Sequence, residues 1–169
     1  MSSWARRLFA FVILAVLMAA VGVRTWTAAQ DPAEDVSDLV ERGLYERAEV
    51  VARSELAQRR SVDALAEATA SDALVRVLLL NGKGSQASTR SIAERALDIK
   101  QSRLGASHRD LAPSLINLGS ALGEVAQHSR ALGLLERAVA LRQRTDAGTV
   151  LLAESLDALG IEMIRAGRM

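Results

Sequence analysis

The chain of 169 residues contains no cysteine, only two prolines and few aromatic residues, which make up 3% of it. The absence of cysteine excludes disulfides, thiolate metal sites and a cysteine nucleophile. No stretch shows the alternation of apolar and polar residues that is typical of a half-buried strand. The formal net charge of +1 argues against a nucleic-acid partner, which requires a strongly basic surface. The remaining composition, rich in apolar residues and in charges of both signs, favours an all-α protein.

Helical spacing of apolar residues is clearest between residues 110 and 144. Two stripes recur there at helical intervals, formed by Leu111, Leu115, Leu118 and Leu122 and by Ala131, Leu134, Leu135, Ala138 and Leu141. Small and polar residues separate the stripes, which predicts two antiparallel helices joined by a tight turn. Along the whole chain we expect helices over 33–42, 44–60, 62–81, 85–103, 110–125, 128–144 and 149–166.

The sequence repeats itself at an interval of about 41 residues, which is typical of stacked helical hairpins. The segment from Ser114 to Gly119 returns 41 residues later as Ser155 to Gly160. The predicted turns within the hairpins fall at Gly43, Gly84, Ala126 and Gly167. These marks predict one repeat domain over 38–169, divided into an opening pair (38–60), two repeats (62–103 and 110–144) and a partial repeat (149–169). Because Arg76 falls where a core leucine is expected, we also predict a one-residue shift of register between 72 and 82.

The repeat resembles the tetratricopeptide repeat. Its signature positions are occupied by Leu115, Leu118, Gly119, Leu122, Ala131, Leu135 and Ala138. The segment around His108, Arg109 and Asp110 is similar to the long inter-repeat loop of the kinesin-light-chain type, although Arg109 replaces the usual proline. The repeats are also longer than the ordinary 34 residues. The resemblance implies a right-handed α-α superhelix in which the first helix of each pair lines a concave groove.

The resemblance also implies which residues meet a ligand in that groove. These are Ile116, Asn117, Ser120, Glu124, Asp157, Ile161 and Arg165. Asn117 matches an asparagine that resembles a clamp for an extended peptide, or else it only caps a loop or faces water. We expect a protein or peptide partner, with no catalysis, no cofactor and no metal. His108 and His128 are expected to be structural, and the Gly-Lys-Gly-Ser segment at 82–85 lacks the spacing of a phosphate-binding loop.

The N-terminal 29 residues differ in kind from the rest. Arg6 and Arg7 precede an apolar run over 8–23, and Ala29 ends an acceptable cleavage site. This pattern predicts either a signal peptide over 1–29 or an uncleaved anchor helix that enters the membrane through residues 5–28. A linker over 30–37 follows. Both alternatives place the repeats outside the cytoplasm, either secreted, periplasmic or anchored to the membrane.

The sequence therefore predicts an exported or membrane-anchored scaffold that binds a protein or peptide. The alternative is the N-terminal repeat region of a longer enzyme, such as a CHAT-type (caspase-like) peptidase, whose catalytic cysteine is absent from this chain. A purely structural partner in a membrane complex is a third reading. Helix 149–166 carries an apolar stripe that a following helix would cover, so we expect this edge to be covered by more of the chain or by another chain, including self-association.

Overall fold

The computed structural model describes residues 35–60 and 62–168, and the regular structure in these residues is entirely helical. The helices are α2 (Val36–Glu41), α3 (Tyr45–Arg59), α4 (Ala64–Leu80), α5 (Ala87–Leu104), α6 (Leu111–Gly123), α7 (His128–Thr145) and α8 (Val150–Arg165). Each lies within a few residues of its predicted range, so the all-α prediction is confirmed. The predicted signal or anchor at 1–29 lies outside the described residues. Among the described helices, none is long and apolar enough to cross a membrane.

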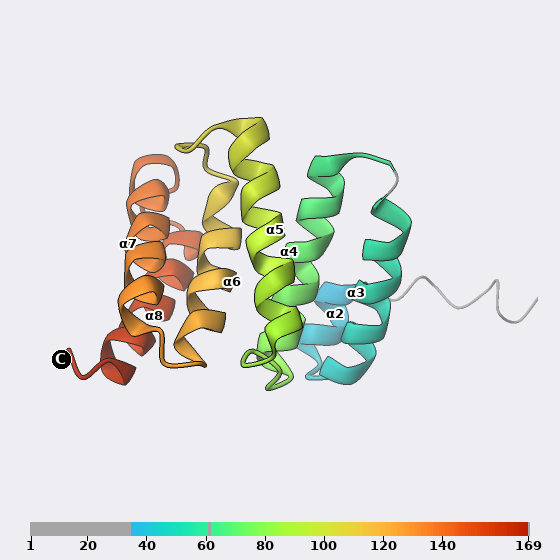
Figure 1. Ribbon diagram of the computed structural model, residues 1–169, viewed down its shortest axis with the longest axis horizontal. Helices are drawn as coiled ribbons and strands as arrows, with labels where there is room; N and C mark the ends of the chain where they lie inside the picture. The colour runs from blue at the N-terminus through green and yellow to red at the C-terminus, as the bar shows by residue number, and fades with distance from the viewer. Residues whose placement is uncertain (1–34, 61, 169) are drawn as a thin grey trace, which may run out of the picture. The chain divides into compact units, whose positions relative to one another are not determined.

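The helices form consecutive antiparallel pairs, α2 with α3, α4 with α5 and α6 with α7, followed by α8 (Figure 1). The turns within pairs lie at one end of the helices, and the loops between pairs lie at the other end. The first helices of successive pairs also contact each other, α4 with α6 and α6 with α8. The repeat unit therefore presents a layer of first helices, and this layer carries the surface of interest.

The first helices end in the same hydrogen-bonded turn, in which a left-handed residue reverses the chain. In α4 the amide of Lys83 donates to the carbonyl of Leu78 over 2.8 Å, and equivalent bonds close α2, α6 and α8. The left-handed residue is Gly82 (φ 69°), so the prediction of Gly84 as the turn residue is wrong. Gly84 is needed for packing instead, because a Cβ there would lie 2.8 Å from Leu79 Cδ2.

The predicted change of register in α4 is confirmed. Leu74 and Val77 are buried and lie 41 residues before Leu115 and Leu118, whereas Arg76 between them is exposed. The turn after α4 spans 81–86, while the turn after α6 spans 124–127. This longer turn restores the register, since the second helices repeat at an interval of 42 residues, as in Ala93 and Leu135.

The turn at 81–86 is held against α3 by a buried carboxylate. Glu49 accepts hydrogen bonds from Lys83 Nζ over 2.7 Å, from Asn81 Nδ2 over 2.8 Å and from Arg53 Nη2 over 2.9 Å. Burial alone would raise the pKa of Glu49, but these hydrogen bonds outweigh it and lower that pKa to about 2. Lys83 is thus engaged within the fold, which agrees with a structural turn and not with a phosphate-binding loop.

Candidate binding groove

An open groove of about 740 Å³ runs across the layer formed by α4, α6 and α8. All seven residues that were predicted to meet a ligand line it, namely Ile116, Asn117, Ser120, Glu124, Asp157, Ile161 and Arg165. The volume lies within the range of small-molecule and peptide-anchoring pockets. The sequence register therefore brought these side chains together correctly, although lining a groove does not show that they bind.

The groove contains residues that sequence reasoning missed. They come from α4, α6, α7 and α8, and include Asp72, Ala73, Arg76, Leu79, Leu80, Pro113, Arg142, Leu151, Glu154, Ala158 and Glu162. The α4 residues were missed because the register of that helix was uncertain. A step of 41 residues back from Asn117 and Ser120 leads to Arg76 and Leu79, and this step would have found them. Arg142 was missed because second helices were expected to face away.

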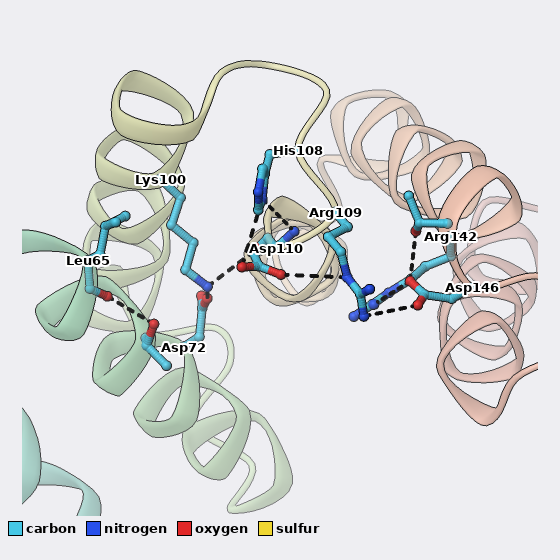
Figure 2. Close-up of polar contacts among 10 residues, drawn as sticks. Leu65, Asp72, Lys100, His108, Arg109, Asp110, Arg142 and Asp146 are labelled. Atoms are coloured by element: carbon cyan, nitrogen blue, oxygen red, sulfur yellow. Dashed lines mark hydrogen bonds and ion pairs between the residues drawn. The ribbon is translucent and has the colours of Figure 1, made fainter.

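One wall of the groove is fixed by a cluster of buried polar residues, Asp72, Lys100, Ser114 and Asn117, here termed the Asp72 cluster. Asp72 Oδ2 accepts from Lys100 Nζ and from Ser114 Oγ, each over 2.6 Å. Figure 2 shows the ammonium of Lys100 between Asp72 and the backbone carbonyl of Asp110, to which it also donates over 3.2 Å. The cluster joins α4, α5 and α6, so it locks one repeat to the next.

Asn117 belongs to this cluster and is only 6% exposed. Its Nδ2 donates to the backbone carbonyl of Asp72 over 3.0 Å. The interpretation that Asn117 caps a loop or faces water is therefore wrong. The clamp for an extended peptide remains a prediction, but the amide nitrogen of Asn117 already binds α4. Substituting this residue would disturb the packing of the groove as well as any ligand contact.

The next junction along the chain is anchored differently, by Arg109, Arg142, Thr145 and Asp146, here termed the Arg142 cluster. Arg142 Nη1 donates to Asp146 Oδ2 over 2.8 Å, and Arg109 Nη2 lies 3.1 Å from Asp146 Oδ1. Figure 2 shows Arg109 reaching from the loop before α6 toward Asp146. The hydrogen bond from Arg142, with one from Thr145, lowers the pKa of Asp146 although burial opposes it. Arg142 Nε is buried without a hydrogen-bond partner.

The far end of the groove contains a buried carboxylate, Glu162, which is 1% exposed. Its Oε1 lies 2.7 Å from His128 Nδ1, whereas its Oε2 is buried without a partner. Gly123 makes room for it, because a Cβ at that glycine would collide with Oε2. His128 thus joins α7 to α8, and His108 Nδ1 accepts the amide of Asp110 over 3.2 Å. Both histidines have structural contacts.

Three charged groups of the groove have no ion-pair or hydrogen-bond partner within the described residues. Arg76 lies on the α4 wall, and Glu154 and Asp157 lie on α8. Apolar side chains such as Ile116 and Ile161 lie between the walls. No group of three or more histidine, aspartate or glutamate side chains in residues 35–60 and 62–168 is placed to hold a metal ion. The arrangement suits non-covalent recognition of an apolar segment with charged flanks.

Comparison with known proteins agrees with this architecture. The model of the tetratricopeptide-repeat family matches residues 87–144. The chain contains tetratricopeptide repeats. Two crystal structures of TPR-like repeats ascribed to a kinesin light chain of Podosopora anserina, one of them a point variant, match with a TM-score of 0.66 and 18% identity. At that identity the likeness shows the fold alone.

The match covers 79% of this chain and 64% of each of those chains, so this chain spans less than two thirds of their length. The resemblance to tetratricopeptide repeats of the kinesin-light-chain type is thus confirmed. No protein of curated function matches the sequence. Tetratricopeptide repeats are generally protein-interaction scaffolds, and the partner of this one follows from its surfaces, not from the comparison.

Proposed function

We propose that this chain is a non-catalytic scaffold that binds a protein or an extended peptide in the groove across α4, α6 and α8. The observation that supports the proposal is the combination of an apolar floor with unpaired charges on both walls. Ile116 and Ile161 offer apolar contacts, while Arg76 faces the α8 side that carries Glu154 and Asp157. Charges that lack a partner in the free protein are available to a ligand, and their positions select its orientation.

Selection from a random peptide library, followed by titration of the selected peptide, tests the groove. Ile161→Glu should weaken binding about tenfold or more, because it places a carboxylate at an apolar contact. Ile164→Glu is the matched control, since Ile164 is also an exposed isoleucine of α8 but does not line the groove. Equal losses in the two variants, or none in either, would reject the groove as the binding surface.

We further propose that the scaffold acts outside the cytoplasm, secreted, periplasmic or anchored to the membrane through residues 5–28. The support is the arginine-flanked apolar run at the N-terminus. Fusion of residues 1–29 to an enzyme that is active only after export tests the localisation. The mass of the mature protein then decides between cleavage after Ala29 and a retained anchor. An inactive fusion would overturn the proposal.

The enzyme alternative, in which these repeats precede a CHAT-type peptidase domain, is tested by the reading frame downstream of the codon for Met169. A second contact surface is favoured by the exposed apolar side chains of α8, among them Val150, Leu156 and Ile164. We propose that this face associates with another polypeptide, its own kind included. The mass of the protein in solution, with and without candidate partners, tests that association.

A further inference from the structure

Helix α8 repeats the face that α6 buries, but nothing in the described residues covers it. Leu115 of α6 is fully buried, whereas Leu156, which lies 41 residues later, is 46% exposed. Leu122 is 1% exposed and its counterpart Met163 is 37% exposed. The difference arises because α7 packs on α6 along this face. The apolar residues of α8 thus form an interface with one side missing.

A glycine on each helix shows what the missing side contains. A Cβ at Gly119 would lie 2.8 Å from Leu135 Cγ, so this glycine receives the leucine of α7. Gly160 lies at the same repeat position on α8, and a Cβ there would meet nothing within 4 Å. The face of α8 therefore has an empty recess at the point where α6 holds a leucine.

A carboxylate on α8 adds a charge requirement. Asp72 of α4 pairs with Lys100 of the covering helix α5, and Glu154 occupies the repeat position of Asp72, 82 residues later. Glu154 has no partner in the described residues. In both covering helices the cation follows the position that faces the glycine register by seven residues, Lys100 after Ala93 and Arg142 after Leu135. A helix that covers α8 in the same way carries its cation opposite Glu154.

We propose that α8 docks an amphipathic helix of a partner protein with a leucine over Gly160 and a lysine or arginine seven residues later facing Glu154. The inference deepens the proposed association at α8 and is independent of a ligand in the groove. A second copy of the chain does not fit. In residues 35–60 and 62–168, only Leu135 is followed seven residues later by a lysine or arginine, and α7 already covers α6 with it.

A helix-stapled, fluorescent peptide with the sequence of residues 127–146 is the probe, because it carries the required pattern. Binding to the full chain is measured by fluorescence anisotropy. Gly160→Leu should weaken binding about tenfold or more by filling the recess. Gly133→Leu is the control, since Gly133 is an exposed glycine of α7 at which an added Cβ would also meet nothing within 4 Å. Thermal unfolding confirms that both variants fold.

A charge exchange tests the register of the docked helix. Glu154→Lys should weaken binding several-fold, and a peptide with glutamate at the position of Arg142 should recover it. Equal binding to the two leucine variants, or no recovery in the exchange, would overturn the proposal. A homodimer that Gly160→Leu dissociates would overturn the choice of a foreign helix. Peptides selected for the groove should bind Gly160→Leu normally, so failure at α8 is distinguishable from failure of the groove.

Discussion

The two junctions between repeats occupy equivalent places but are anchored by different chemistry. In the Asp72 cluster, Lys100 finds a carboxylate on the first helix of its own pair. Arg142 stands 42 residues after Lys100, but the position that corresponds to Asp72 is Pro113. Arg142 pairs instead with Asp146 at the end of its own helix, and its Nε remains without a partner. One substitution along the repeat therefore redirects a buried cation.

This difference separates two roles of polar residues in the same layer. The Asp72 cluster is closed, because each of its buried side-chain nitrogen and oxygen atoms has a partner, and it serves cohesion between α4, α5 and α6. The junction with α8 is open, since Arg142 Nε and Glu162 Oε2 lack partners and both residues line the groove. Buried groups without partners are costly, so they mark the places where a ligand has most to contribute.

Breaking the closed junction should have the largest effect. Asp72→Ala leaves Lys100 buried without its carboxylate, and we expect the free energy of unfolding to fall by about 3–5 kcal/mol. Urea unfolding measures this loss. Glu154→Ala is the matched control at the equivalent position of α8, where the carboxylate is exposed and unpaired, and it should change stability by less than about 0.5 kcal/mol. Similar losses in both variants would mean that the ion pair contributes little.

A pair of glycine substitutions should give a smaller effect of opposite sign. Gly119→Ala forces a Cβ against Leu135 and should cost about 1–3 kcal/mol. Gly160→Ala meets no neighbour and should raise stability by about 0.5–1 kcal/mol, because alanine favours the helix. Differential scanning calorimetry of the two variants measures both shifts. A loss of stability in Gly160→Ala would show that the face of α8 is covered in the isolated chain.

Most of the fold was predictable because it depends on local spacing. Apolar periodicity placed the helices, and the repeat interval alone placed Asn117 and Asp157 in one groove. The turn after α4 was misplaced because Gly82 and Gly84 are both plausible turn residues. Only the contact of Gly84 with Leu79 and Glu124 distinguishes their roles, and the contact with Glu124 is made between segments distant in the sequence.

The polar clusters were not predictable, because interleaved charges are typical of solvated helix faces. Asp72, Lys100 and Ser114 meet only after α4, α5 and α6 have packed. A partial signal exists, since Ser114 and Asn117 lie three residues apart on an otherwise apolar helix. Such spacing places two polar groups on one face and indicates a common partner. The burial of Glu162 needed the space left by Gly123, which lies on another helix.

The smallest expected effect concerns the acid sensitivity of the open junction. Because the pKa of Asp146 is lowered by the hydrogen bond from Arg142, its contribution to stability is complete above the ordinary carboxyl pKa of about 3.9. That contribution is lost as the pH falls through the lowered value. Asp146→Asn should therefore melt below the wild type at neutral pH and approach it in acid. Glu49 loses its own contribution over the same range, but it does so equally in both proteins, so the difference between the two melting curves isolates Asp146. A difference that stays constant from pH 7 to about pH 2 would contradict the role of Asp146 as the charged partner of Arg142.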